Sequence, residues 1–349
     1  MRLHSSHYGS DHIGLAGTCG IVWNLFVPLG YVHTFDPVAL PIYGNLALRW
    51  YGLAYLIGFV GGWWMLREMA RRRLWVLAPE RTADFIAAAA LFGVFLGGRL
   101  GYVLFYQIPR DGFASIVENP MVLLRVWEGG MASHGGILGL VVFSWIYAKR
   151  AGVSWTGLGD GLCLAAPIGI FCGRIANFIN GELYGRAAGV PWAVKFPLSL
   201  AEEDRATQAA AWQACERASP VPLDGTMAGL VGAAREFPAV AAELGDYLTP
   251  RHPSQIYAAL LEGLLLFVIL LVVRLRWRDS PHGLLTALFF LGYGLFRIIG
   301  EIFREPDAAW VVEGWVTRGQ FLSAFMLVAG GLFLWHALRR GGGGTQRES

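Results

Sequence analysis

Charged residues are scarce in this sequence, and neither sign dominates. Asp, Glu, Lys and Arg make up 15% of the 349 residues, whereas hydrophobic residues make up 55% and the mean hydropathy is +0.47. Soluble chains carry about 25% charged residues, so this composition excludes an ordinary soluble domain and indicates an integral membrane protein. The net charge of only +3, with no basic run interleaved with aromatic residues, excludes nucleic acid as a partner.

Cysteine is also rare, and its spacing is uninformative for metal or redox chemistry. The sequence contains no CxxC pair, so it predicts neither a zinc site nor a redox-active disulfide. We therefore assign the cysteines to packing. They are Cys19, Cys163, Cys172 and Cys215.

Long apolar runs, in contrast, are abundant. A helix needs about 20 mostly apolar residues to cross a bilayer, and seven segments of roughly this kind are present. The sequence therefore predicts an all-α integral membrane protein with seven transmembrane helices and an external helical loop lobe. The predicted spans are 50–66, 84–106, 131–148, 157–176, 254–273, 282–302 and 320–338.

Basic residues in the loops predict the orientation of these spans. Arg and Lys cluster after the first, third, fifth and seventh segments, and such clusters favour the cytoplasmic side of the membrane. The N-terminus is therefore predicted outside and the C-terminus in the cytoplasm. The clusters are Arg67 with Arg71, Arg72 and Arg73; Lys149 with Arg150; Arg274 with Arg276 and Arg278; and Arg339 with Arg340.

We divide the chain into three parts on this basis. Residues 1–45 form an N-terminal external or interfacial segment, 46–340 form the seven-helix transmembrane domain, and 341–349 form a disordered cytoplasmic tail. Within the second part, 199–250 is an external insertion whose Ala and Glu content favours short amphipathic helices.

The apolar run at 14–32 allows three interpretations. It is an eighth span, an interfacial segment, or part of a start-site extension. We prefer the interfacial segment because its glycines and Pro28 weaken a helix. We assign the histidines upstream of it to a disordered tail, in preference to a weak metal site. They are His4, His7 and His12.

The stretch GRIANFINGELYGR, at 173–186, places polar groups directly after an apolar run. Arg174, Asn177 and Asn180 are spaced by three residues, which puts them on one face of a helix. Ionisable residues at membrane depth are costly and usually face the bundle interior or a wet cavity. A lone arginine there would be read as a snorkelling side chain, but similar residues occur at the other predicted outer ends.

Those outer ends carry histidine, tyrosine, arginine and carboxylate side chains, whereas the inner ends carry only Arg and Lys anchors. The stretch GGMASHGG is predicted to bury His134 among glycines that permit close backbone approach. The spacing of Tyr293, Arg297, Glu301 and Arg304 predicts one shared helical face, and an internal Arg297–Glu301 ion pair is an equal alternative. The remaining outer-end residues are Tyr51, Arg99, Glu182, Arg251 and His252.

Arginine binds phosphate bidentately and is always charged, and histidine transfers protons near neutral pH. The residues therefore predict a catalytic site on the outer-leaflet side that binds a lipid phosphate. Two alternatives stay open. One is a lipid or anion transporter, which would place its site near the midplane between repeats; the other is a different phospholipid transferase or phosphodiesterase, which would bring carboxylates for Mg²⁺.

Five motifs in order, RWYGLAY, GGMASHGG, GRIANFINGELYGR, HPSQIYAALLEG and RIIGEIFREPD, resemble those of the bacterial prolipoprotein diacylglyceryl transferase family. The resemblance runs from about residue 35 to the last predicted span. It implies transfer of the diacylglyceryl group of phosphatidylglycerol to the thiol of a lipobox cysteine in a preprolipoprotein. It also implies a thioether product, release of glycerol phosphate, no metal or organic cofactor, and location in the bacterial cytoplasmic (inner) membrane.

The resemblance also implies which residues matter, and we attach hypothetical roles to them. Arg174 and Arg297 would bind the phosphate, and His134 would be the base for the thiol or a hydrogen-bond donor to the headgroup. Tyr51 and Asn177 would orient the glycerol, and Glu182 would hold an arginine in place. Substrate binding would further involve Gly185, Tyr293 and Arg304, the last at the outer rim. We add Arg99 to the binding residues because it lies in the outer half of the second predicted span.

Overall fold

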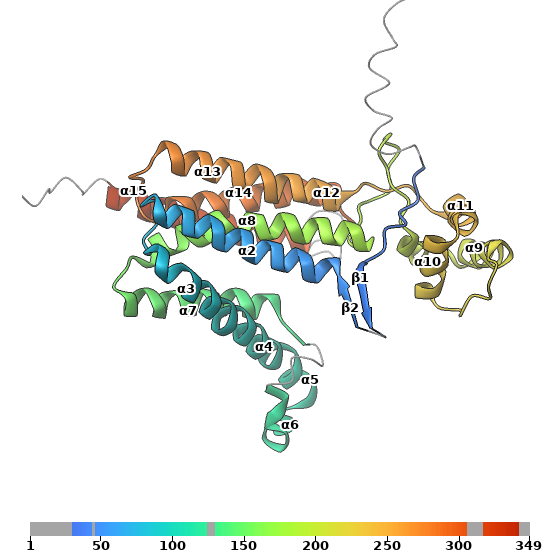
Figure 1. Ribbon diagram of the computed structural model, residues 1–349, viewed down its shortest axis with the longest axis horizontal. Helices are drawn as coiled ribbons and strands as arrows, with labels where there is room; N and C mark the ends of the chain where they lie inside the picture. The colour runs from blue at the N-terminus through green and yellow to red at the C-terminus, as the bar shows by residue number, and fades with distance from the viewer. Residues whose placement is uncertain (1–29, 44–45, 124–129, 306–316, 342–349) are drawn as a thin grey trace, which may run out of the picture. The chain divides into compact units, whose positions relative to one another are not determined.

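A computed structural model describes residues 30–43, 46–123, 130–305 and 317–341 (Figure 1). The predicted features at 1–29, including the three N-terminal histidines and Cys19, lie outside the described residues, as do residues 342–349 of the tail predicted for 341–349. The chain forms two compact units. The smaller comprises Met1–Asp36 and Tyr184–Pro253, and the larger comprises Pro37–Leu183 and Ser254–Ser349.

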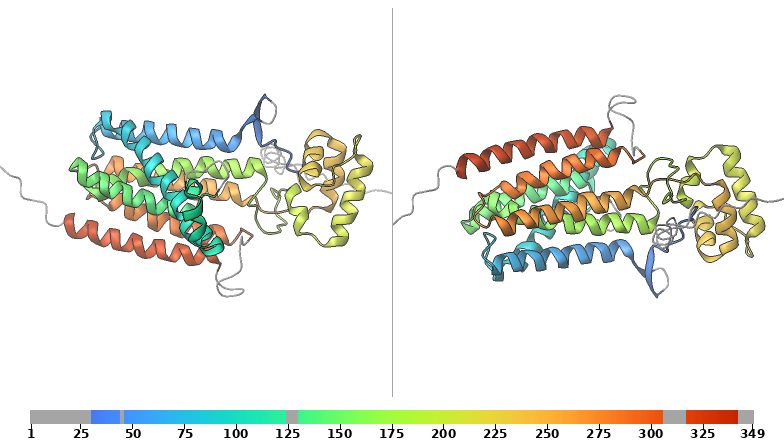
Figure 2. Two further views of the ribbon diagram at one scale, coloured as in Figure 1. Left: turned by 90° about the horizontal axis from the view of Figure 1, so that it is seen from below. Right: turned by 90° about the horizontal axis from the view of Figure 1, so that it is seen from above.

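The larger unit is a bundle of long helices that run side by side (Figures 1 and 2). Each of the seven predicted segments corresponds to one of these helices. Their bounds are Trp50–Arg71 for α2; Pro79–Asp111 for a composite helix that contains α3 (Thr82–Ala88), α4 (Leu96–Tyr102) and α5 (Ile108–Asp111); Ser133–Ala151 for α7; Trp155–Asn180 for α8; Ser254–Arg276 for α12 (Ser254–Ala258) and α13 (Leu266–Arg276); Leu284–Glu301 for α14; and Arg318–Gly341 for α15.

Five helices in the described part of the chain are long and apolar enough to cross a membrane. Helices α2 and α7, with 22 and 19 residues, are not among the five. The count of seven spans therefore stays a prediction. The five spans are Pro79–Asp111, Trp155–Asn180, Ser254–Arg276, Leu284–Glu301 and Gly319–Arg339.

A two-stranded antiparallel hairpin adds a feature that the all-α prediction did not contain. Strands β1 (Val38–Tyr43) and β2 (Leu46–Arg49) pair directly before α2, and the Trp50 backbone N–H donates to the Pro37 carbonyl where strand gives way to helix. Two short helices, α6 (Ala114–Glu118) and a 3₁₀ turn (Pro120–Leu123), follow the composite helix.

Glycines allow α7 to cross the composite helix almost backbone to backbone, as the GGMASHGG pattern predicted. A Cβ atom on Gly101 would lie 2.5 Å from the Gly135 Cα, and one on Gly139 would lie 2.3 Å from the Gly93 carbonyl oxygen. No ordinary side chain fits these gaps. The predicted burial of His134 is wrong, because the neighbouring glycines face the composite helix while the imidazole is exposed.

Buried charges at one end of the larger unit are satisfied by backbone groups. Asp160 of α8 accepts from the backbone N–H groups of Gly283 and Thr286, both at 2.8 Å, and from the Thr286 hydroxyl at 2.9 Å. It therefore caps the first turn of α14 from a neighbouring helix. Arg274, which the sequence suggested as a membrane anchor, is only 6% exposed and donates from Nε to the Leu74 carbonyl at 2.7 Å. We call this the aspartate end.

The smaller unit contains the short helices predicted for 199–250. They are α9 (Arg205–Ala218), α10 (Met227–Glu236) and α11 (Pro238–Tyr247), preceded by a 3₁₀ turn at Pro197–Glu202. Asp204 begins α9 by accepting from the N–H groups of Ala206 and Thr207. The helices close over a small apolar core that includes Leu200, Ala211, Cys215, Leu230, Val240 and Leu244. The predicted external location of this insertion stays a prediction.

Candidate active site

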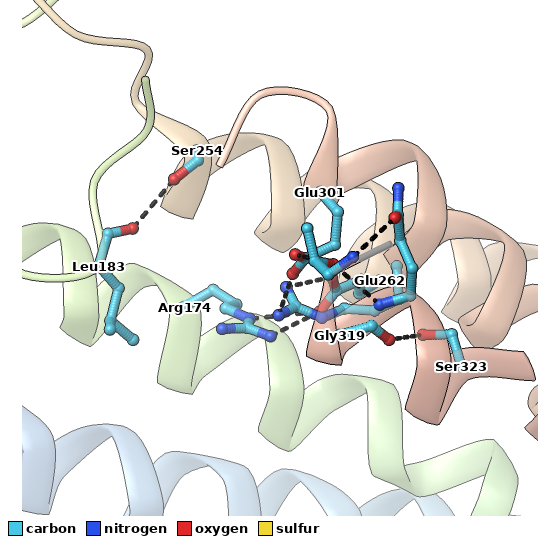
Figure 3. A network of polar contacts seen from close by, with 10 residues as sticks. Arg174, Leu183, Ser254, Glu262, Glu301, Gly319 and Ser323 are labelled. Atoms are coloured by element: carbon cyan, nitrogen blue, oxygen red, sulfur yellow. Dashed lines mark hydrogen bonds and ion pairs between the residues drawn. The ribbon is translucent and has the colours of Figure 1, made fainter. Parts of the chain in front are cut away.

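Arg174, near the C-terminal end of α8, binds a carboxylate from a different helix. Its Nη2 and Nε donate to the Glu262 Oε2 atom at 2.8 and 3.3 Å (Figure 3). Glu262 lies in a π-helical stretch, Ala259–Leu265, between α12 and α13, and its side chain is 0% exposed. Such π-helical bulges are frequent at functional sites. Arg174 is therefore held by a carboxylate buried inside the bundle.

Arg297 of α14 approaches the same carboxylate from the other side. Its Nη1 lies 3.7 Å from the Glu262 Oε1 atom, and its Nη2 forms an ion pair with Glu301 one turn later. Glu301 in turn accepts a hydrogen bond from the Thr317 hydroxyl at 2.8 Å. The internal Arg297–Glu301 ion pair considered from the sequence is thus confirmed, and it forms part of a larger network.

The network of Arg174, Glu262, Arg297 and Glu301 is charge-balanced, with two guanidinium groups against two carboxylates. The arginine side chains keep 17% and 15% exposure, whereas Glu262 is fully buried. Glu262 Oε1 makes no hydrogen bond within the described part of the chain. The site is therefore less cationic than the arginines alone suggested. Its guanidinium groups bind anionic oxygens with a fork geometry that phosphate can also occupy.

A second group of polar residues joins α2 to α8 beside this network. The Tyr51 hydroxyl donates to the Asn177 Oδ1 atom, and Glu182 lies next to Tyr51. The Tyr51 hydroxyl also interacts electrostatically with the Arg174 guanidinium group. Tyr293, one turn before Arg297, is close to both arginines. The structure thus gathers six predicted residues: Tyr51, Arg174, Asn177, Glu182, Tyr293 and Arg297.

The turn after α8 is tied down by the start of α12. Gly181 ends α8 in the left-handed conformation, at φ 71°, where glycine is favoured. The Gln255 amide then donates to the Glu182 carbonyl at 2.7 Å, and the Ser254 hydroxyl donates to the Leu183 carbonyl at 2.9 Å. These bonds fix the backbone on which Glu182 sits. We call the end that holds Arg174 and Glu262 the arginine end.

Three further predicted residues belong to the larger unit. Arg99 is buried in the composite helix and donates to the Gly130 carbonyl at 3.0 Å. His134, exposed in the first turn of α7, makes no hydrogen bond to the arginines within the described residues. Arg304 lies three residues past the end of α14, so the predicted common helical face stops at Glu301 because the helix itself ends there.

The other predicted outer-end residues belong to the smaller unit. The Gly185 backbone N–H donates to the His252 carbonyl at 2.8 Å, and Arg251 forms an ion pair with Glu202 at 2.7 Å. Burial lowers the pKa of the His252 imidazole and so favours its neutral form.

The sequence analysis missed one member of the network, Glu262, and one residue bonded to it, Thr317. The carboxylate that pairs with Arg174 is Glu262, whereas Glu182 lies beside Tyr51 instead. Glu262 is the one charged residue of the predicted span 254–273, and an isolated charge inside a span is itself a signal of function. Thr317 carried no such signal. In the described part of the chain, no group of three or more His, Cys, Asp or Glu residues could hold a metal ion.

Comparison with known proteins agrees with the motifs. The family model described as prolipoprotein diacylglyceryl transferase matches residues 37–336, which include every member of the network. The chain belongs to this family. Relatives named phosphatidylglycerol–prolipoprotein diacylglyceryl transferase include proteins from Coxiella burnetii (38% identical over 315 residues, 89% of this chain and 98% of the relative), Allorhizobium ampelinum (39% over 329 residues, 92% and 96%) and Salmonella arizonae (40% over 321 residues, 89% and 96%).

Membership of the prolipoprotein diacylglyceryl transferase family, together with the apolar helices, marks the chain as a bacterial membrane protein and an enzyme of the transferase class. The resemblance read from the five motifs is thereby confirmed.

Proposed function

We propose that this chain transfers the diacylglyceryl group of phosphatidylglycerol to the lipobox cysteine of a preprolipoprotein. The cysteine sulfur attacks C3 of the lipid glycerol, a carbon–sulfur bond forms, and the carbon–oxygen bond to phosphate breaks. The thiol proton is released, and glycerol phosphate leaves with the bonding electrons. The names of the relatives support both substrates, and the reaction is a first step of lipoprotein maturation.

The observation that carries this proposal is the convergence of Arg174 and Arg297 on one buried carboxylate. Negative charge grows on the leaving phosphate oxygen, and preorganised cations aimed at that oxygen supply the largest catalytic effect. Glu262 and Glu301 hold the two guanidinium groups at fixed positions, at 2.8 Å in the Arg174 pair. The phosphate would take up guanidinium donors that Glu262 does not use.

Tyr51 and Asn177 would orient the lipid glycerol next to these arginines. Tyr293 and Glu182 would line the rest of the binding site. Arg99 and Arg304 would contribute to binding from other segments of the larger unit. The thiolate is the nucleophile, and a free thiol has a pKa near 8.5, so a base is needed near neutral pH. His134 is our candidate for that base, since its imidazole is exposed at the start of α7.

The location of the protein is a further part of the proposal. We place it in the bacterial cytoplasmic (inner) membrane with all seven long helices spanning the bilayer, the N-terminus outside and the C-terminus in the cytoplasm. The basic clusters in alternate loops support this orientation. Residues 46–340 would form the catalytic domain, with 199–250 as its external lobe, between an external N-terminal segment at 1–45 and a cytoplasmic tail at 341–349.

Reconstitution of the full chain with phosphatidylglycerol and a lipobox peptide tests the reaction. We expect the intact mass of the peptide to rise by one diacylglyceryl unit, and glycerol phosphate to appear in equal amount. No mass gain, with transbilayer movement of lipid instead, would support the transporter. Loss of transfer on adding a chelator would support a metal-dependent phospholipid transferase instead.

A further inference from the structure

Two buried side-chain oxygens at the arginine end have no hydrogen-bond donor in the described part of the chain. They are the Gln255 Oε1 atom at the start of α12 and the Asn180 Oδ1 atom at the end of α8. Gln255 is only 1% exposed. An unpaired buried acceptor costs free energy, so folded proteins normally supply it with a donor. The mechanism above uses neither oxygen.

The orientation of the Gln255 amide is set by its nitrogen. The Nε2 atom donates to the Glu182 carbonyl at 2.7 Å, and a carbonyl oxygen can only accept. Exchanging the amide oxygen and nitrogen would therefore bring two acceptors together. Oε1 is thus the end of the amide that needs a donor. Asn180 lies two residues before Glu182 in the chain and brings a second amide oxygen to this region.

Both oxygens lie beyond the paired arginines in the same direction. Arg174 pairs with Glu262. Eight residues after Arg174, Glu182 pairs with Gln255, seven residues before Glu262, so the two segments run antiparallel. Asn180 is six residues past Arg174, or about 9 Å along the helix axis. Gln255 is about 10 Å before Glu262 by the same measure.

The headgroup of phosphatidylglycerol offers hydrogen-bond donors at a matching distance. Its phosphate only accepts hydrogen bonds, whereas its glycerol carries two hydroxyl donors. A phosphate oxygen lies about 2.8 Å from a guanidinium nitrogen, and the covalent path from that oxygen to the terminal hydroxyl spans about 6–7 Å. A headgroup whose phosphate binds the arginines therefore reaches the region of the two amide oxygens.

Neutral acceptors also suit a neutral headgroup. A buried ammonium group, such as that of phosphatidylethanolamine, needs a carboxylate to balance its charge, and the two amides supply none. A hydroxyl needs only an acceptor. The number of unpaired amide oxygens equals the number of glycerol hydroxyls, so each hydroxyl can have its own partner.

We propose that Gln255 and Asn180 select the glycerol headgroup by accepting hydrogen bonds from its two hydroxyls; the inference rests on the proposed function. Both are then specificity-determining residues that take no part in bond breaking. Backbone N–H groups of the peptide substrate are the other donors that reach the site. The lipid is favoured because its glycerol is bonded to the phosphate, whereas the attacking sulfur approaches C3 from the side opposite the leaving oxygen.

Phosphatidylpropanol, which lacks both headgroup hydroxyls, tests the proposal on the wild-type protein. It competes with chain-deuterated phosphatidylglycerol for a lipobox peptide, and the peptide mass reports which lipid was used. We expect phosphatidylglycerol to be preferred about 100-fold, or about tenfold for each hydrogen bond. Equal use of the two lipids would assign the amide oxygens to buried water and overturn the proposal. No mass gain from either lipid would overturn the proposed reaction itself.

Gln255→Met removes the acceptor while filling a similar volume. We expect the preference for phosphatidylglycerol over phosphatidylpropanol to fall about tenfold. Ser254→Ala is the matched control, because it removes only the neighbouring hydrogen bond to the Leu183 carbonyl, and we expect it to keep the wild-type preference. An unchanged preference in Gln255→Met would overturn the proposal. Equal falls in both variants would do the same, since a loosened turn would then explain them. A raised KM for the peptide with an unchanged lipid preference would assign Gln255 to the peptide instead.

Asn180→Asp places a carboxylate where the amide stood. With phosphatidylethanolamine and chain-deuterated phosphatidylglycerol in competition, we expect relative use of phosphatidylethanolamine to rise about tenfold, because the carboxylate pairs with its ammonium group. Asn180→Leu removes the same oxygen without adding charge, and we expect no such rise. A wild-type ratio in Asn180→Asp, or an equal rise in both variants, would overturn the proposal.

Discussion

The aspartate end and the arginine end of the larger unit both bury charged side chains, but they satisfy them in different ways. At the aspartate end, Asp160 and Arg274 bond mainly to backbone groups and to the Thr286 and Ser280 hydroxyls. At the arginine end, Arg174 and Arg297 bond to carboxylates. The two ends are separated by 14 residues along α8, or about 21 Å.

This difference separates a structural role from a functional one. Asp160 fixes the start of a helix, and the backbone N–H groups it binds have no other partner in that turn. Arg174 and Arg297 instead hold side-chain partners that an incoming anion can partly replace, because Glu262 Oε1 has no hydrogen bond within the described residues. Substitutions at the aspartate end should therefore change stability, and those at the arginine end should change activity.

Arg174→Lys should have the largest effect on activity. Lysine keeps the charge but loses the fork that donates from both Nε and Nη2. We expect the transfer rate to fall by about 10²–10³, the cost of removing one preorganised donor. Initial rates of peptide mass gain measure this change. Retained activity together with lowered thermal stability would place Arg174 with the residues of the aspartate end.

Glu262→Gln should have the next largest effect on activity. The amide keeps the size of the carboxylate but leaves two guanidinium groups without their shared counter-charge. We expect kcat to fall at least about tenfold, roughly 1.4 kcal/mol, because the arginines are no longer held in one position. Glu262→Asp shortens the same group, and we expect it to recover part of the loss. A fall in folded yield with normal kcat would contradict the proposed role.

Asp160→Asn is the matched change at the aspartate end. The asparagine amide would place N–H donors beside the backbone N–H groups of Gly283 and Thr286, which need an acceptor. We therefore expect a loss of about 1–3 kcal/mol in the free energy of unfolding. Thermal unfolding in detergent, followed by circular dichroism, measures it. The rate per folded molecule should equal the wild-type rate, and a lower rate would show that the two ends are coupled.

Arg274→Lys should have the smallest effect of the four. Two guanidinium nitrogens of Arg274 bond the Leu74 carbonyl and a third bonds the Ser280 hydroxyl. A lysine replaces only part of this set, so we expect a loss of about 1 kcal/mol in stability and no change in transfer rate. The same unfolding and mass-gain measurements apply. A changed rate would be evidence against a purely structural aspartate end.

Much of the fold could be predicted because its signals are local. Apolar length predicted every long helix of the larger unit, and the glycines beside His134 predicted a close backbone approach at the start of α7. The spacing of Arg174 and Asn177 along α8 likewise placed both at the arginine end. The β1–β2 hairpin was missed because a short pair of strands carries no signal comparable to a 20-residue apolar run.

The partners of the charged residues could not be predicted in this way. Arg174 pairs with Glu262, 88 residues later in the chain, and nothing local to either residue indicates the other. The burial of Arg274 was missed because its sequence context is that of an ordinary loop arginine. The exposure of His134 was missed because the sequence showed the neighbouring glycines but not which side of α7 they face.

The sequence by itself determined that this protein is a helical membrane protein of one family, because composition and short motifs are properties of the chain alone. The tertiary structure decided which charges neutralise which, since an ion pair inside a bundle depends on distances between helices that no spacing along the chain specifies.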